Sequence, residues 1–302
     1  MTQFTALSFS IILFLFGLSI GSFLNVVALR YRGAGRLFSF KKKRSHCPYC
    51  DKALAWYELI PLLSFVIQFG RCHHCDQRLS WQYPLGELLG GLVLLLPVYF
   101  YNYYDIFHRA LVGEIIWPYY VLIAVWTLAA LAMLLLTLID WHLKIIPDQI
   151  NLFLLSLGIV GAVILSGTSV ASGVERSHNL SFLENYAEIF GGPSSIWLNH
   201  LMAAAVGLLF FGFIIVASRG RAMGVGDLKL AGALGLLLGW PDIILTIASS
   251  FVVGSLWGIY LLIFKSKTLK STVPFGPFLV IGVFITIFFG HDLASWYFSL
   301  ML

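Results

Sequence analysis

Charged residues are scarce in this chain: they make up 11% of its 302 residues, while 59% are hydrophobic. With a mean hydropathy of +0.89, the chain has too little polar surface for a soluble globular domain. Its long apolar runs do not show the period-two alternation of an outer-membrane β-barrel. These absences leave one fold class, an all-α polytopic membrane protein.

The sequence motifs of several enzyme classes are also missing. The chain has no nucleotide-binding glycine loop, no G-x-S-x-G turn and no H-E-x-x-H helix. No internal repeat is evident. The first apolar run, 7–29, lacks the basic leader and the Ala-x-Ala exit of a signal peptide, so we interpret it as a retained membrane span.

The apolar runs predict about eight transmembrane helices. One of them, 228–240, is short enough to be a re-entrant segment. We interpret it as a short span, because re-entry would move the lysines of 265–273 to the side that is otherwise poor in basic residues. The predicted spans are residues 7–29, 84–103, 117–139, 150–167, 196–218, 228–240, 243–264 and 274–290.

In this predicted topology most basic residues lie on one side of the membrane. Of the 19 lysines and arginines, 17 fall in or beside alternate loops. Such an excess marks the cytoplasmic side, so both termini are predicted to lie outside. Because the charges follow topology and form no patch on a folded domain, we expect contact with lipid head groups and no nucleic-acid partner. The predicted cytoplasmic loops are 30–83, 140–149, 219–227 and 265–273.

All four cysteines lie in the loop 30–83, as two C-x2-C pairs separated by 21 residues. Two such turns place four thiolates around one tetrahedral ion, which indicates a structural zinc site without an open position. Disulfides are disfavoured in a reducing cytoplasm. The predicted ligands are Cys47, Cys50, Cys72 and Cys75, and the alternative ligands are His46, His73 and His74.

Two aspartates lie at the edges of apolar runs. Asp140 directly follows the run 117–139, and Asp227 separates a glycine-rich turn from the run 228–240. A carboxylate in hydrocarbon costs about 2.5–3.5 kcal/mol on insertion scales, so each aspartate is expected to have a function and a partner. The predicted topology places both aspartates at the cytoplasmic face, where we expect them to lie close together.

Two adjacent carboxyl groups share one proton, so that one acts as a base toward water and the other as an acid toward a leaving amine. This chemistry needs no serine or cysteine nucleophile. The pattern therefore predicts an aspartyl peptidase with Asp140 and Asp227 as the catalytic pair. Gly224 and Gly226 would permit positive φ and close backbone approach, which would let an extended substrate lie against the turn.

Other interpretations remain open for these acids. Each aspartate would alternatively cap a helix or pair with a base such as Lys229 or Lys144. A proton-coupled transporter also uses intramembrane acids, but it would place them near the bilayer midplane. A scaffolding zinc membrane protein would leave the two acids unexplained.

Several other polar residues are expected to be structural. Asp148 follows Pro147 and is predicted to start a helix. Asn25 is expected to hydrogen-bond to a neighbouring helix, with Gly21 allowing close packing. Glu87 lies near the predicted membrane boundary, where it would pair with a base of the cysteine loop or extend to water.

Over nearly its whole length the chain resembles the type IV prepilin peptidases, which are bifunctional leader peptidase/N-methyltransferases. The G-x-G-D turn alone is shared with presenilin-like and archaeal preflagellin peptidases, but its combination with the cysteine loop is specific. The chain departs from the family in a long segment near 168–195 and in the absence of a proline at 30–32. The motifs that carry the resemblance are 21–27, the paired C-x2-C turns, 60–64, 83–87, 139–140, 147–148, 224–230 and 274–278.

The resemblance implies that Asp140 and Asp227 cut the basic leader of prepilins and pseudopilins at the cytoplasmic face of the bacterial inner membrane. It also implies N-methylation of the new terminus with S-adenosylmethionine, tied to the cysteine loop around Gly70 and Arg71. A peptidase without methylation remains an alternative. The expected organisation is a first transmembrane helix at 1–29, a cytoplasmic four-cysteine zinc loop at 30–83 and a transmembrane aspartyl peptidase bundle at 84–302.

Overall fold

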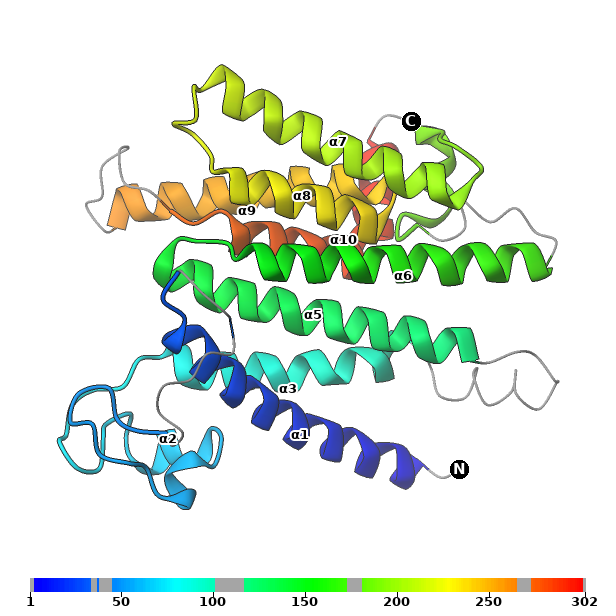
Figure 1. Cartoon of the computed structure of the whole chain (residues 1–302). Coiled ribbons are helices and arrows are strands. Elements are labelled where there is room, and N and C mark those ends of the chain that lie inside the picture. The colour runs from blue at the N-terminus through cyan, green and yellow to red at the C-terminus, as the bar shows by residue number, and fades with distance from the viewer. Residues whose placement is uncertain are drawn as a thin grey trace. The chain divides into compact units, whose positions relative to one another are not determined.

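The computed structural model describes residues 3–33, 37, 45–100, 117–172, 181–264 and 273–300, and these fold into helices joined by loops (Figure 1). Within these ranges the only extended pairings are two isolated β-bridges, so the predicted all-α class is confirmed. The chain forms two compact units, Met1–His142 and Leu143–Leu302, which are described separately below.

Six helices of the described part are long and apolar enough to cross a membrane, which makes the chain a multi-pass membrane protein. Two predicted spans are shorter than this. The described apolar part of α3 (Gln82–Phe100) is Gln82–Leu96, and α8 (Val225–Leu238) has 14 residues. The count of eight spans therefore stays a prediction. The six long helices are α1 (Gln3–Arg30), α5 (Trp117–Leu143), α6 (Asp148–Ser172), α7 (Ile196–Ala217), α9 (Asp242–Phe264) and α10 (Gly276–Ser299).

In the first unit α1 packs closely along α3. Glycines allow this approach: a Cβ on Gly17 would lie 2.5 Å from the carbonyl oxygen of Gly90, and Gly21 is similarly covered by Gly86. The Asn25 side chain is fully buried, and its Nδ2 donates a 3.0 Å hydrogen bond to the carbonyl oxygen of Tyr83. The expected packing role of this part of α1 is thereby confirmed.

The segment between α1 and α3 carries the four cysteines. It contains a short 3-10 helix, η1 (Trp56–Leu59), and one short helix, α2 (Leu63–Ile67), which contact each other. The two β-bridges, His46 with Ala53 and Arg71 with Arg78, also lie here. A segment with so little regular structure needs additional cross-links to hold a fixed shape.

In the second unit α8 is the central helix, and α6 and α7 pack against it (Figure 1). All nine residues 230–238 are buried, as expected for a helix that is apolar on every face. Close approach again depends on glycine, because a Cβ on Gly235 would lie 2.5 Å from the carbonyl oxygen of Ala203 in α7. α9 packs along α10, where the hydroxyl oxygens of Thr246 and Thr286 are 2.9 Å apart.

The start of α6 follows its sequence signal, whereas several helix ends differ from the predicted spans. α6 begins at Asp148, directly after Pro147, as predicted. α10 begins at Gly276 and continues to Ser299, beyond the predicted end at 290. The predicted loop 140–149 is shorter than expected, because α5 continues to Leu143. No helix-breaking residue precedes Pro147, so the helix extends past the end of the apolar run. Asp140 therefore lies within the last turn of α5.

Candidate functional site

The four cysteine sulfurs form a compact cluster in the first unit. The sulfurs of Cys47, Cys50, Cys72 and Cys75 all lie within 4.8 Å of one another, and those of Cys47 and Cys75 are 3.9 Å apart. A tetrahedral ion with metal–sulfur bonds of about 2.3 Å separates its sulfurs by about 3.8 Å. All four thiols are free. The donor set therefore fits one four-coordinate metal ion and does not form two disulfides.

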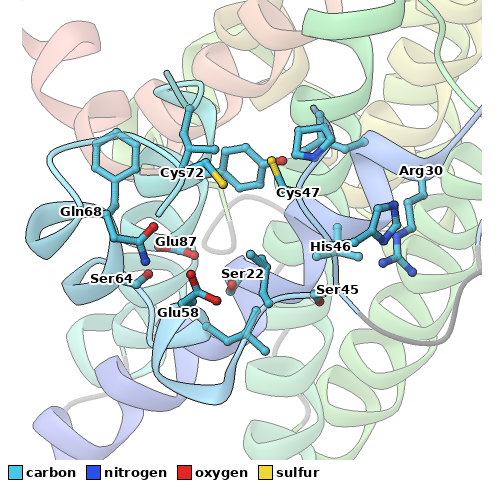
Figure 2. Close-up of a pocket in the computed structure, with 18 residues that line it drawn as sticks. Ser22, Arg30, Ser45, His46, Cys47, Glu58, Ser64, Gln68, Cys72 and Glu87 are labelled. Atoms are coloured by element: carbon cyan, nitrogen blue, oxygen red, sulfur yellow. The ribbon is translucent and has the colours of Figure 1, made fainter. Parts of the chain in front are cut away.

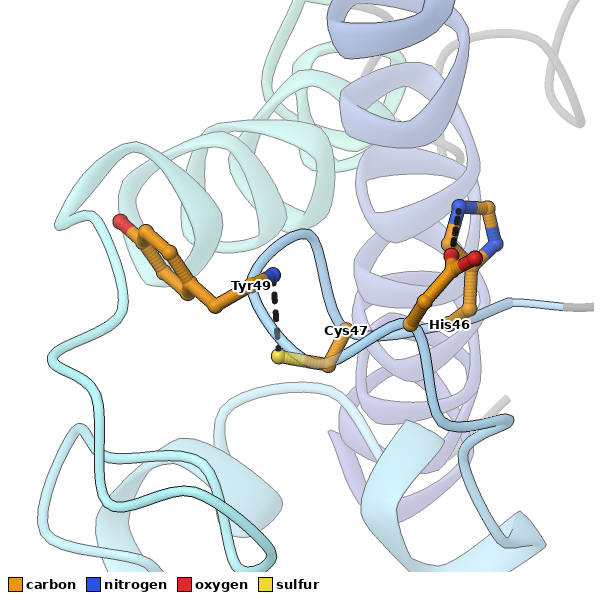
Figure 3. A network of polar contacts seen from close by, with 4 residues as sticks. His46, Cys47 and Tyr49 are labelled. Atoms are coloured by element: carbon orange, nitrogen blue, oxygen red, sulfur yellow. Dashed lines mark hydrogen bonds and ion pairs between the residues drawn. The ribbon is translucent and has the colours of Figure 1, made fainter.

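The two C-x2-C turns approach each other from separate parts of the loop, and Figure 2 labels one cysteine of each. The backbone N–H of Tyr49 points at the Cys47 sulfur at 3.4 Å, as Figure 3 shows. In the second turn the N–H of His74 points at the Cys72 sulfur, also at 3.4 Å. Such N–H groups stabilise negative charge on a ligating thiolate.

The two turns are repeats of one local structure. Asp51 and Asp76 directly follow the two turns and have positive φ angles of 60° and 54°. The backbone N–H of each aspartate donates a 3.0 Å hydrogen bond to the carbonyl oxygen of the first cysteine of its turn, Cys47 or Cys72. The pattern C-x2-C-D-x2-L-x-W occurs at both 47–56 and 72–81. The expectation that no internal repeat exists is therefore wrong at this short scale.

The thiols of the cluster cannot all ionise without a cation. Burial opposes ionisation of Cys72, but the N–H groups of His74 and Cys75 and the neighbouring thiols outweigh it and lower its pKa to about 7. At Cys75 the N–H of Gln77 favours the thiolate, but burial and the adjacent sulfurs raise its pKa to about 12. A bound metal cation would remove this conflict, because it stabilises all four thiolates together.

The three histidines considered as ligands lie outside this cluster. The His46 Nε2 is 3.6 Å from Asp51 Oδ1, an interaction drawn in Figure 3. His73 and His74 are exposed, and their rings contact each other edge to face. Among the described residues the metal-binding group contains only cysteines.

Asp227 lies in the first turn of α8. Its Oδ2 accepts a 3.3 Å hydrogen bond from the backbone N–H of Gly224, so the aspartate does cap its helix, as one alternative predicted. The alternative in which Asp227 pairs with Lys229 is wrong, because the Lys229 ammonium forms its ion pair with Asp148, at 2.7 Å from Oδ1. The cap uses one oxygen of the Asp227 carboxylate, and the side chain is half-buried.

The glycines of the turn do not use the positive φ that glycine permits. Gly224 precedes α8 with φ −88° and ψ 157°, and Gly226 lies inside the helix. The need for glycine at 226 is steric instead. A Cβ there would lie 3.1 Å from Cβ of Ile146, in the segment that leads into α6.

Asp140 is buried, with 3% of its surface exposed, in the last turn of α5. It belongs to the first unit, whereas Asp227 belongs to the second. Each carboxylate is thus placed within its own unit, and their pairing stays a prediction.

Two buried glutamates stand out in the first unit. Glu58 and Glu87 are each 7% exposed, and both line a pocket of about 220 Å³ between α1, the cysteine loop and α3 (Figure 2). Among the described residues Glu87 pairs with no base of the cysteine loop, and its Oε2 accepts a 2.8 Å hydrogen bond from the N–H of Leu62. Sequence reasoning missed Glu58, although it is the one acid within the largely apolar stretch 53–67.

The residues predicted to lie near the methyl-donor site occupy the edge of this region. Gly70 has a φ of +66°, and a Cβ there would lie 3.0 Å from the Phe65 ring. Arg71 is exposed. The pocket is lined by their neighbours Gln68 and Cys72. The predicted site at Gly70 and Arg71 remains a prediction.

Comparison with known proteins identifies the family in two parts. Residues 15–101 match the model of the Bacterial Peptidase A24 N-terminal domain. Residues 127–259 match the model of the Type IV leader peptidase family. No solved structure matches the chain significantly.

Curated relatives named prepilin leader peptidase/N-methyltransferase match this chain over almost their full length. The protein of Aeromonas salmonicida is 29% identical, over 98% of this chain and 96% of the relative. The protein of Legionella pneumophila is 27% identical, over 94% and 92%. The protein of Bacillus subtilis is 27% identical, over 96% and 98%. Because the two family models together match more than half of the sequence, the chain belongs to the type IV leader peptidase family.

Proposed function

We propose that this protein is a membrane-embedded aspartyl endopeptidase that removes the basic leader of prepilins and pseudopilins and then N-methylates the new terminus with S-adenosylmethionine. The observation that carries the proposal is the match to relatives named prepilin leader peptidase/N-methyltransferase over more than nine-tenths of both chains. Such coverage includes the cysteine loop as well as the aspartates.

The proposed catalytic pair is Asp140 and Asp227. Both lie in terminal turns of apolar helices, where an extended peptide has access to them more easily than at the membrane midplane. Chain connectivity supports the pairing. Ile146 lies beside Gly226 at the start of α8, and Asp140 precedes Ile146 by only six residues.

Peptide hydrolysis by this pair follows from the sharing of one proton. The ionised carboxylate takes a proton from water, which attacks the scissile carbonyl. The protonated partner then donates to the amine that leaves. The Gly224 N–H holds one oxygen of Asp227 and so fixes the orientation of its carboxylate. This mechanism needs no other nucleophile.

The cysteine cluster is proposed to hold one structural zinc ion. With four thiolates bound, the ion has no open position for a substrate, so its contribution is to the folding of the loop. In zinc-finger peptides binding supplies roughly 10–16 kcal/mol, which is ample for a segment with little core of its own. The loop in turn forms part of the pocket that contains Glu58 and Glu87.

The proposed location is the bacterial inner membrane, with the cysteine loop and the aspartates toward the cytoplasm and both termini outside. The uneven distribution of lysine and arginine among the loops supports this orientation. The basic stretch 41–44 is proposed to contact anionic lipid head groups.

The test is to incubate the purified protein with a prepilin and S-adenosylmethionine and to weigh the product by mass spectrometry. We expect loss of the leader and gain of one methyl group. Asp140→Asn and Asp227→Asn should each leave the prepilin uncut, whereas the exposed Asp292→Asn should behave like wild type. A cut but unmethylated product would favour the peptidase-only alternative. An uncut substrate with the wild type would refute the peptidase and leave the transporter as the alternative.

A further inference from the structure

The pocket beside the cysteine cluster has a lining that the peptidase chemistry does not use. It lies between α1, the loop and α3 and has a volume of about 220 Å³. Most of its wall is apolar or aromatic, including Val26, Leu29, Phe65 and Tyr83. Two carboxylates in such a wall need an explanation, because a buried charge is stable only with a partner.

Glu58 has one satisfied and one unsatisfied oxygen. Its Oε2 accepts a 2.7 Å hydrogen bond from the backbone N–H of Ala55. Its Oε1 is fully buried, and no donor among the described residues lies within hydrogen-bonding distance of it. An acceptor left in this state costs about 1–3 kcal/mol, and more when it is charged. Figure 2 shows the Glu58 carboxylate directed into the pocket.

Glu87 adds a second carboxylate to the same wall. It accepts hydrogen bonds from the Leu62 N–H at 2.8 Å and from the Ser22 hydroxyl, both of which are neutral donors. In the part of the chain that the structure describes, neither Glu87 nor Glu58 forms an ion pair. Of the two basic residues that line the pocket, His46 has its Nε2 3.6 Å from Asp51 Oδ1, and Arg30 lies beside His46 at the right of Figure 2.

The lining favours an organic cation over a metal ion. Calcium takes six to eight oxygen ligands and magnesium keeps several waters, whereas most of the surface of this wall is apolar. A cation that carries alkyl groups matches both parts of the lining. Its charge would face the two carboxylates, and its carbon atoms would lie against Phe65 and Tyr83.

We propose that Glu58 and Glu87 form the anionic wall of a binding site for an organic monocation that takes part in methyl transfer. The proposal rests on the proposed function. Two cations of that reaction share the required chemistry, the α-ammonium of the newly cut pilin and the sulfonium of the methyl donor. The pocket holds the charged centre of one of them, and the loop shields it from water, which strengthens its attraction to the carboxylates.

The donor arm of the test compares two ligands that differ by one methyl group and one positive charge. Binding of S-adenosylmethionine and S-adenosylhomocysteine to the full chain in detergent is measured by equilibrium dialysis. If the sulfonium is the occupant, the wild-type protein should bind S-adenosylmethionine at least ~10-fold more tightly than S-adenosylhomocysteine. The Glu58→Gln variant should bind the two ligands with affinities that agree within about 2-fold. Glu188→Gln, an exposed glutamate of the second unit, is the matched control and should keep the wild-type preference.

The pilin arm uses a peptide with the sequence of the mature pilin N-terminus, with either a free or an acetylated amine. If the ammonium is the occupant, wild type should prefer the free amine by at least ~10-fold, and Glu58→Gln should lose this preference. Charge preference in one arm alone identifies the source of the cation. Equal binding of charged and neutral ligands by wild type in both arms would overturn the proposal.

The variant is designed to preserve the fold. Glutamine at 58 keeps an oxygen for the Ala55 N–H, so bound zinc and melting temperature should match wild type. If Glu58→Gln does not fold, the wild-type ligand pairs and Glu87→Gln decide the question. The same wild-type preparation is assayed for methylation of a cut prepilin. Absence of methylation refutes the methyl-transfer part of the proposed function, whereas methylation without any charge preference refutes only the cation site.

Discussion

Replacing Gly235 with alanine should destabilise the second unit, although alanine is the better helix former. Gly235 lies at the contact between α8 and α7, where a Cβ would be 2.5 Å from the Ala203 carbonyl oxygen and 2.7 Å from Cα of Ala204. Both neighbours are backbone atoms, so relief requires a shift of one helix. Overpacking of this kind costs about 1–3 kcal/mol.

The helix-propensity part of the change has a direct control. Gly258 in α9 has no heavy atom within 4 Å of the position that a Cβ would occupy. Gly258→Ala should therefore be neutral or stabilising by up to about 1 kcal/mol, because alanine replaces the more flexible glycine. The difference between the two variants isolates the steric cost at the interface of α7 and α8.

Thermal unfolding of the purified protein in detergent measures this difference. A change of 1 kcal/mol corresponds to about 2–4 °C for a unit of 150–250 residues. We expect Gly235→Ala to melt several degrees below Gly258→Ala and to lose leader cleavage, since α8 also carries Asp227. Equal melting temperatures of the two variants would show that α7 and α8 do not approach as closely as described.

Two further substitutions test the other parts of the fold. Cys75→Ser removes one of four sulfurs that lie within 4.8 Å of one another, so zinc measured by mass spectrometry should fall from about one ion per chain and the loop should become sensitive to protease. Retention of full zinc would contradict a four-thiolate site. Asp242→Ala leaves the Ser181 hydroxyl and the Phe182 N–H without their buried acceptor, at about 1–3 kcal/mol for each lost bond. The melting temperature of Asp242→Ala should fall by several degrees, whereas Asp292→Ala, at an exposed position, should keep the wild-type melting temperature.

Features encoded within a few residues could be predicted from the sequence. The C-x2-C spacing fixes how two thiols point from one turn, and the observed sulfur cluster agrees with it. Pro147 followed by Asp148 predicted the start of α6 because the ring and the acid both favour a first helical turn. The membrane class followed from composition alone. None of these inferences required knowledge of which helices are neighbours.

Features that depend on long-range packing could not be predicted in this way. Glu58 resembles an ordinary loop acid until the loop folds against α1 and α3 and buries it. The glycine at 226 was assigned to backbone freedom, whereas its observed neighbour is Ile146, eighty positions earlier in the chain. The short length of α8 predicted a short membrane span. The burial of residues 230–238 depends on glycines of other helices, such as Gly207, where a Cβ would lie 2.7 Å from the Ala231 carbonyl oxygen.

The division into two units has a consequence for the two proposed activities. The cation pocket is built entirely from residues before His142, whereas the proposed catalytic pair takes Asp140 from the first unit and Asp227 from the second. If both proposals hold, hydrolysis should depend on the folding of both units, and the cation site should depend on the folding of the first unit alone. Packing defects confined to α8, such as Gly235→Ala, should remove leader cleavage but leave cation binding intact. Removal of the metal ion from the four-cysteine cluster should weaken cation binding more than leader cleavage, because Cys47 and Cys72 line that pocket.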